Sequence, residues 1–133
     1  MAATTRLRDR SDVESIFGQI MERTIARIPG AVGGAFAAQD GETVDSATEW
    51  DATEWQIFTA HFGIILHHVQ SCLHTFHFGE AEVVIMNYRE MDIVVQAVSE
   101  GYYALIAVQP PSSLGVAINA LRDASTQLKV EMA

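Results

Sequence analysis

A cluster of histidines is the part of this 133-residue sequence whose residue types are most suited to chemistry. The stretch HHVQSCLHTFH, residues 67–77, holds four of the five histidines and the only cysteine, and His61 lies six residues before it. Imidazole and thiolate groups are common zinc ligands, and both also serve in acid–base or nucleophilic catalysis. Either chemistry requires side chains that converge on one point, which depends on the secondary structure of this segment.

The histidines are predicted to lie on one long helix over about 51–79. Asp51 with Glu54 forms a capping box, and Gly79 is a helix stop signal. On a helical wheel with about 100° between successive residues, one face is apolar and is predicted to pack on the core: Phe58, Phe62, Ile65, Val69, Leu73 and Phe76. A mixed stripe gathers beside it: Ile57, His61, Ile64, His68 and Cys72. A third set is predicted opposite the core: Gln56, Ala60, Gly63, His67, Gln70 and His74.

On this wheel the histidines do not converge. His61 and His68 are seven residues apart, about 10.5 Å along a helix axis, too far for one metal ion. Two pairs lie one helical turn apart, His68 with Cys72 and His74 with His77. Each pair supplies two ligands, whereas a closed zinc site takes four. We therefore expect no metal and no cofactor. The alternative is a small-ligand or metal sensor, with a pocket beside this helix lined by His61, His68 and Cys72.

The mixed stripe predicts a second contact for the helix. A lone helix on a sheet needs only one apolar face, and the symmetric copy of the same helix is the natural partner for a second one. We expect a dimer interface made of Ile57, His61, Ile64, His68, Cys72, Val83 and Ile85. Glycine costs about 1 kcal/mol in a helix interior, and Gly63 would allow close approach of another backbone. The third set is therefore the expected partner-binding surface: Gln56, Ala60, Gly63, His67, Gln70 and His74.

Other candidates for catalysis are weak, and we expect a protein that is not an enzyme, with no catalytic residues. Cys72 lies mid-helix among apolar neighbours, where a cysteine is usually buried and inert. The acidic residues near 42–54 are typical of a solvated face with one helix cap. Gly33-Gly34 lacks the phosphate-loop pattern, and the only lysine is Lys129, so we expect no bound GTP.

Composition narrows the class of partner. The chain carries a formal net charge of -9, which disfavours nucleic acid and membrane surfaces. Hydrophobic residues make up 49% of it, enough for a buried core. A single cysteine allows no intrachain disulfide, and the opening MAATTRLRDRSD lacks the apolar region of a signal peptide. We expect a cytoplasmic protein without membrane insertion.

The rest of the chain predicts an α/β domain. A helix over about 12–28 is capped by Ser11 and Glu14 and stopped by Pro29-Gly30. Two extended runs flank an Asp40-Gly41 turn, and three β-rich runs cover about 81–88, 91–98 and 102–109. A last helix follows Pro110-Pro111, capped by Ser112 or Ser113, with a predicted stripe at Leu114, Ile118, Leu121, Ala124 or Ser125, and Leu128.

The resulting order is α-β-β-α-β-β-β-α. Three consecutive strands with short connections favour a five-stranded antiparallel sheet, and its valine- and isoleucine-rich strands call for helices on both faces. We expect a flexible N-terminal tail over 1–11 and a single domain over 12–133.

Two stretches in this order resemble the Roadblock/dynein light chain family, a relative of the longin and profilin-like folds. They are IPGAVGGAFAAQDGETVDSA and MDIVVQAVSEGYYALIAVQPPSSLGVAINALRDASTQL. The resemblance implies a Roadblock/profilin-like sandwich and a homodimer formed through the third strand and the second helix. It also implies a non-enzymatic adaptor or regulator of a Ras-like small GTPase in polarity, motility or signalling, or a dynein light chain-like scaffold. The second helix, with its aromatic residues and histidines, departs from the family's more Ala/Leu-rich pattern.

Overall fold

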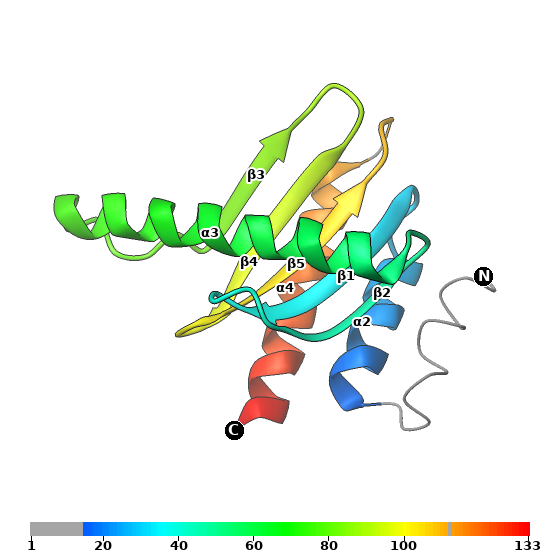
Figure 1. Ribbon diagram of the computed structural model, residues 1–133, viewed down its shortest axis with the longest axis horizontal. Coiled ribbons are helices and arrows are strands. Elements are labelled where there is room, and N and C mark those ends of the chain that lie inside the picture. The colour runs from blue at the N-terminus through cyan, green and yellow to red at the C-terminus, as the bar shows by residue number, and fades with distance from the viewer. Residues whose placement is uncertain (1–14, 112) are drawn as a thin grey trace.

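The computed structural model describes residues 15–111 and 113–133, so the expected tail at 1–11 and the cap at Ser11 lie outside the described residues. The elements follow in this order: α2 (Ile16–Ala26), β1 (Ala31–Ala38), β2 (Thr43–Thr48), α3 (Ala52–Phe76), β3 (Val83–Asn87), β4 (Asp92–Ser99), β5 (Tyr102–Val108) and α4 (Leu114–Met132). The predicted order α-β-β-α-β-β-β-α is confirmed (Figure 1).

The five strands form one antiparallel sheet in the order β2-β1-β5-β4-β3. The predicted hairpin between β1 and β2 is confirmed, and Gly41 takes a φ of 99°, a conformation that favours glycine. β2 and β3 are the outermost strands in this order, so they form the two edges of the sheet. The helix α3 connects one edge to the other. The β3 edge therefore offers unpaired backbone groups among the described residues.

Local caps set the boundaries of the outer helices. Ser15 is the N-cap of α2 and its side chain accepts a hydrogen bond from the backbone N–H of Gly18. The helix ends at Ala26, two residues before the predicted end, and Gly30 turns the chain with a φ of 86°. Ser113 caps α4 by accepting from the N–H of Val116, as one of the two predicted serines.

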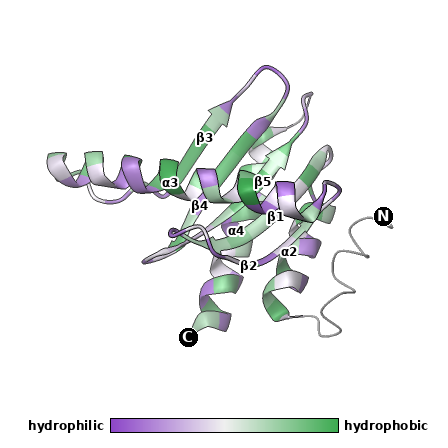
Figure 2. Cartoon of the chain, in the orientation of Figure 1, coloured by the Kyte–Doolittle hydropathy of each residue, from purple (hydrophilic) through white to green (hydrophobic). Residues whose placement is uncertain are grey.

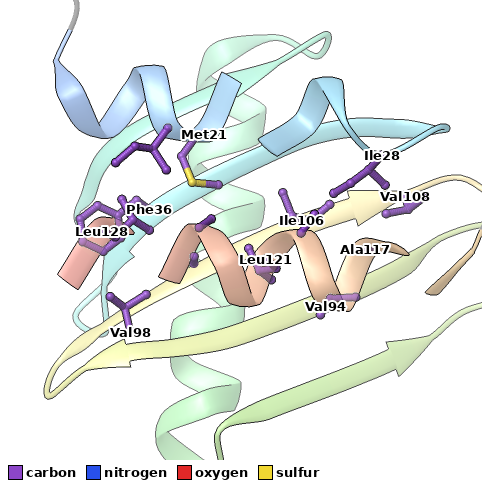
Figure 3. Close-up of a cluster of buried hydrophobic side chains, with 14 residues drawn as sticks. Met21, Ile28, Phe36, Val94, Val98, Ile106, Val108, Ala117, Leu121 and Leu128 are labelled. Atoms are coloured by element: carbon purple, nitrogen blue, oxygen red, sulfur yellow. The ribbon is translucent and has the colours of Figure 1, made fainter. Parts of the chain in front are cut away.

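The face of the sheet covered by α2 and α4 holds the larger core cluster. Met21, Phe36, Ile106 and Leu121 are buried there, as Figure 3 shows. The predicted stripe of α4 packs against this cluster, with Leu114 and Ile118 half-buried. Alanines join its buried part, which consists of Ala117, Ala120, Leu121, Ala124, Ser125 and Leu128. Small side chains let the helix lie close to β4 and β5.

Among the described helices, α3 alone crosses the other face of the sheet (Figure 1). Trp55 is fully buried beneath the start of this helix, stacked with Phe58 at 5.1 Å between ring centroids and edge-on to Trp50 at 5.2 Å. The strands are mostly hydrophobic in Figure 2, whereas the β1–β2 and β3–β4 turns are hydrophilic. No helix within the described residues is long and apolar enough to cross a membrane.

Candidate functional site

The helix α3 carries every residue singled out by the histidine pattern. It begins as predicted at Asp51, whose side chain accepts from the N–H of Glu54 at 3.1 Å. It ends at Phe76, three residues before the predicted stop at Gly79, because His77 adopts the left-handed conformation with a φ of 59°. Its N–H donates to the carbonyl of His74 at 3.2 Å, which satisfies one of the terminal carbonyl groups.

The orientation of α3 differs from the predicted one. The residues buried against the sheet are Trp55, Thr59, Phe62, Gly63 and Leu66. Of the predicted core stripe only Phe62 is buried: Phe58, Ile65, Val69 and Leu73 are half-buried, and Phe76 is 62% exposed. The helix is therefore turned about its axis by roughly 70°, counted at 100° per residue.

Gly63 faces the sheet, so the prediction that it lies on an outer, partner-binding face is wrong. A Cβ atom at this position would lie 2.9 Å from the hydroxyl of Tyr103 and 3.2 Å from the carbonyl oxygen of Gln39. The hydroxyl is held there because it donates to the carbonyl of Thr59 at 2.8 Å. Burial raises the pKa of Tyr103 to about 12. The contacts with Tyr103 and Gln39 within the chain thus explain why position 63 is a glycine.

The other members of the expected partner-binding surface divide into two groups. Ala60 is half-buried beside Gly41. Gln70 is half-buried and clamps the α3–β3 connection: its Nε2 donates to the carbonyl of Ala81 at 3.0 Å, and its Oε1 accepts from the Ala81 N–H at 2.7 Å. Three members remain exposed: Gln56, His67 and His74.

The stripe expected to form the dimer contact points away from the sheet. Ile57 and Ile64 are 56% and 54% exposed, and His61, His68 and Cys72 are exposed with them. The ring Nδ1 of His61 lies 2.7 Å from the carbonyl oxygen of Ile57, one turn earlier. The expectation that Cys72 is buried packing is wrong, because the free thiol lies on the outer side of the helix.

The edge strand β3 presents its side chains alternately to the two faces of the sheet. Val83 packs against the cluster beneath α2 and α4, and Ile85, two residues on, is 43% exposed on the same side. Val84 and Met86 instead pack against the cluster beneath α3. Val83 and Ile85 therefore lie on the face of the sheet opposite α3, so within one chain they do not adjoin the exposed α3 stripe. Their place in a dimer interface stays a prediction.

The second half of α3 extends beyond the sheet, past β3, in Figure 1. No residue from His67 to Phe76 is buried. Phe76 and Phe78 stack on each other at 5.8 Å between ring centroids, and they are 62% and 77% exposed. Contiguous exposed apolar groups of this kind mark interaction surfaces.

The histidines do not form a metal site in this conformation. Among the described residues, no three His, Cys, Asp or Glu side chains are placed to hold one metal ion. The sensor alternative predicted a pocket lined by His61, His68 and Cys72, but all three are exposed on the outer side of α3. A different hollow, of about 610 Å³, is lined by His67, His74 and His77 with Gln70, Ser71, Gly79 and Glu80. It exists because the connection after α3 folds back along the helix, which no sequence pattern signalled.

Comparisons with solved structures identify the fold. A Roadblock/LC7 domain from Streptomyces avermitilis superposes with a TM-score of 0.80 at 12% identity, over 86% of this chain and 96% of that chain. Myxococcus xanthus MglB gives a TM-score of 0.81 at 12% identity, over 90% and 98% of the two chains. The gliding protein MglB of Thermus thermophilus gives 0.78 at 13% identity, over 91% and 96%. No family model and no curated protein matches the sequence. The Roadblock/profilin-like fold inferred from the sequence is confirmed.

Proposed function

We propose that this protein is a non-enzymatic, homodimeric adaptor or regulator that binds a Ras-like small GTPase in polarity, motility or signalling. Two observations carry the proposal: the exposed apolar stripe of α3, centred on Ile57 and Ile64, and the outer edge of β3, which pairs with no strand among the described residues. A free strand edge and exposed isoleucines are both surfaces that soluble chains normally cover.

Pairing β3 with its copy about a twofold axis would remove the free edge and continue the sheet across two subunits. The overhanging half of α3 would then lie over the junction rather than in solvent (Figure 1). In this arrangement β3 contributes through its backbone edge, and the contact on the α3 side comes from Val84 and Met86 rather than from Val83 and Ile85. The stripe Ile57, His61, Ile64, His68 and Cys72 is the side-chain part of the proposed interface.

The GTPase part of the proposal comes from the resemblance of the sequence and the shared fold with MglB proteins, one of which is named a gliding protein. The surface proposed for the partner is limited to the residues that remain exposed: Gln56, His67 and His74. Gly63 and Gln70 are excluded because each serves a contact within the chain.

The dimer is tested by light scattering coupled to gel filtration, with the wild type and the variant Ile64→Asp. Ile64 is 54% exposed, so burying the rest of it contributes about 0.8–1.5 kcal/mol, half the value for a whole isoleucine. A twofold interface buries two copies, so the dissociation constant should rise roughly 15- to 200-fold. Val130→Asp is the matched control, because Val130 is 66% exposed at the far end of α4. A wild-type mass of one chain at micromolar concentration would refute the dimer.

The GTPase partner is tested by capture from a lysate of the source organism with GDP or a non-hydrolysable GTP analogue. We expect a Ras-like small GTPase to bind preferentially in one nucleotide state. The double variant His67→Ala, His74→Ala should reduce the capture, whereas Val130→Ala should leave it unchanged. Absence of any small GTPase in both states would remove this part of the proposal and leave the dimer to be judged separately.

The hollow lined by His67, His74 and His77 favours a second function, a sensor that binds a small ligand or, with further ligands supplied by a second chain, a metal ion. Titration with Zn²⁺ in a calorimeter separates it from the adaptor. Stoichiometric uptake that is lost in His74→Ala supports the sensor, and no uptake supports the adaptor.

A further inference from the structure

Three exposed residues on the outer side of α3 have side chains that bind metal ions. His61, His68 and Cys72 lie on the same stripe of the helix as Ile57 and Ile64. Imidazole nitrogens and thiolates are common ligands of zinc in proteins. The helix contains no lysine or arginine, so none of its own side chains repels a cation at this stripe.

The ring of His61 is held in the tautomer that suits a metal ligand. Its Nδ1 lies 2.7 Å from the carbonyl oxygen of Ile57. A carbonyl oxygen only accepts hydrogen bonds, so Nδ1 carries the proton and donates it. The lone pair of the neutral ring is then on Nε2, at the far end of the side chain. Histidines that bind metals usually make such a hydrogen bond to a backbone carbonyl with their other ring nitrogen.

His68 and Cys72 form a second group of ligands on the same helix. They are four residues apart, so their Cβ atoms are neighbours on the helix surface, about 5–6 Å from each other. His61 comes seven residues before His68, about 10.5 Å along the axis, which is too far to join them within one chain. In agreement, no three His, Cys, Asp or Glu side chains in the described part of the chain are placed to hold one metal ion. A third ligand has to come from a second chain.

The proposed dimer, on which this inference rests, supplies that ligand. Within the stripe, His61 and His68 are equally distant from the midpoint between residues 64 and 65, and so are Ile57 and Cys72. A twofold axis that pairs the two β3 edges also reverses the direction of α3, so its two copies run antiparallel. With the axis at the midpoint, His61 of one chain lies opposite His68 of the other. Cys72 of that other chain follows one helical turn further along.

The place of β3 favours an axis close to this part of the helix. Ala81, two residues before β3, is hydrogen-bonded to Gln70 of α3, so the β3 edge starts next to the helix (Figure 1). Ile64, 54% exposed, lies beside the midpoint of the stripe. The metal ligands therefore flank a central apolar contact between the two helices, one set on each side.

We propose that the dimer binds two zinc ions, each held by His61 of one chain and by His68 and Cys72 of the other. Three protein ligands leave the fourth position of a tetrahedral site open to water, and the Cys72 thiol loses its proton on binding. Because each site is complete only in the dimer, zinc stabilises the dimer. With free zinc at ten times its dissociation constant, two sites should lower the dissociation constant of the dimer about 100-fold.

The first test is a calorimetric titration of the EDTA-treated, dialysed full chain with Zn²⁺, paired with light scattering on gel filtration with and without the metal. We expect one zinc ion per chain and a shift toward the mass of the dimer. His61→Ala and His68→Ala should each abolish the uptake. His74→Ala is the matched control, because His74 is an exposed histidine of the same helix that lines the separate hollow near its end, and it should bind zinc like the wild type.

The second test asks whether the ligands come from two chains. His61→Ala and the double variant His68→Ala, Cys72→Ser should each bind no zinc alone. A mixed dimer of the two contains one intact site, with His61 from the double variant and His68 and Cys72 from the other chain. Mixing should therefore restore uptake, to about one zinc ion per mixed dimer.

The outcomes separate this proposal from the dimer itself. A wild-type dimer that takes up no zinc would overturn the zinc site and leave the dimer standing, whereas a monomer with and without zinc would overturn both. Zinc uptake by a monomer, loss of uptake in His74→Ala, or no recovery on mixing would also overturn the shared site.

Discussion

Replacing Gly63 by alanine tests the orientation of α3 on the sheet, from which the assignment of its surfaces follows. For an exposed glycine in a helix, alanine should stabilise the protein by about 1 kcal/mol. The structure predicts instead that Gly63→Ala destabilises the protein. The new Cβ would lie 2.9 Å from the Tyr103 hydroxyl and 3.2 Å from the Gln39 carbonyl oxygen, both closer than ordinary contacts.

The magnitude follows from two opposing effects. Overpacking of a buried site costs about 1–3 kcal/mol, and the better helix propensity of alanine returns about 1 kcal/mol. We therefore expect Gly63→Ala to lower the free energy of unfolding by roughly 1 kcal/mol. The hydroxyl is the closest atom and is fixed by its bond to Thr59, so Tyr103→Phe should relieve part of the cost. In that background the penalty of Gly63→Ala should be smaller.

The assay is urea unfolding followed by tryptophan fluorescence, at one protein concentration because the proposed dimerisation would add stability. Gly115→Ala in α4 is the matched control, since its Cβ would meet only the Ser113 Oγ, at 3.7 Å. It should be neutral or stabilising. A double-mutant cycle over Gly63 and Tyr103 measures the coupling directly. If Gly63→Ala were as stabilising as Gly115→Ala, the orientation of α3 described above would be refuted.

Two further predictions concern the contacts around α3. Gln70→Ala removes both hydrogen bonds to Ala81, so it should lower the free energy of unfolding by about 1–3 kcal/mol and speed amide hydrogen exchange at residues 79–82. The control Gln56→Ala, at an exposed position, should change neither quantity. Unchanged exchange at Ala81 in Gln70→Ala would contradict the clamp. Tyr103 should titrate well above the ordinary tyrosine pKa when absorbance at 295 nm is followed, because burial raises its pKa to about 12. Because the folded pKa is above the unfolded value, the stabilisation from this group is complete below about pH 10 and is lost as the pH rises toward 12, a dependence that Tyr103→Phe should abolish.

Local patterns in the sequence were sufficient for the secondary structure. The Asp51 cap, the Asp40-Gly41 turn and the three β-rich runs each act through a few neighbouring residues, and each appears where it was predicted. Short connections between the last three strands then restricted the sheet to an antiparallel one. The end of α3 was misplaced because glycine was the expected stop, while histidine can also adopt the left-handed conformation.

The face that α3 turns toward the sheet could not be read from the sequence. Apolar residues occur around most of the helix, so its periodicity allows several orientations, and the largest side chains suggested the wrong one. The observed orientation depends on Tyr103, which extends from β5 to the carbonyl of Thr59 and leaves room only for a glycine at 63. That contact joins residues 44 positions apart.

The sequence by itself determined the elements, their order and the sheet, because these depend on caps, turns and periodicities within short segments. Only the tertiary structure decided which residues are surface. It buried Gly63, exposed Cys72, and placed Val83 and Ile85 on the face opposite α3. The physical reason is that exposure depends on what packs against each side chain, and those neighbours come from strands and turns distant in the chain.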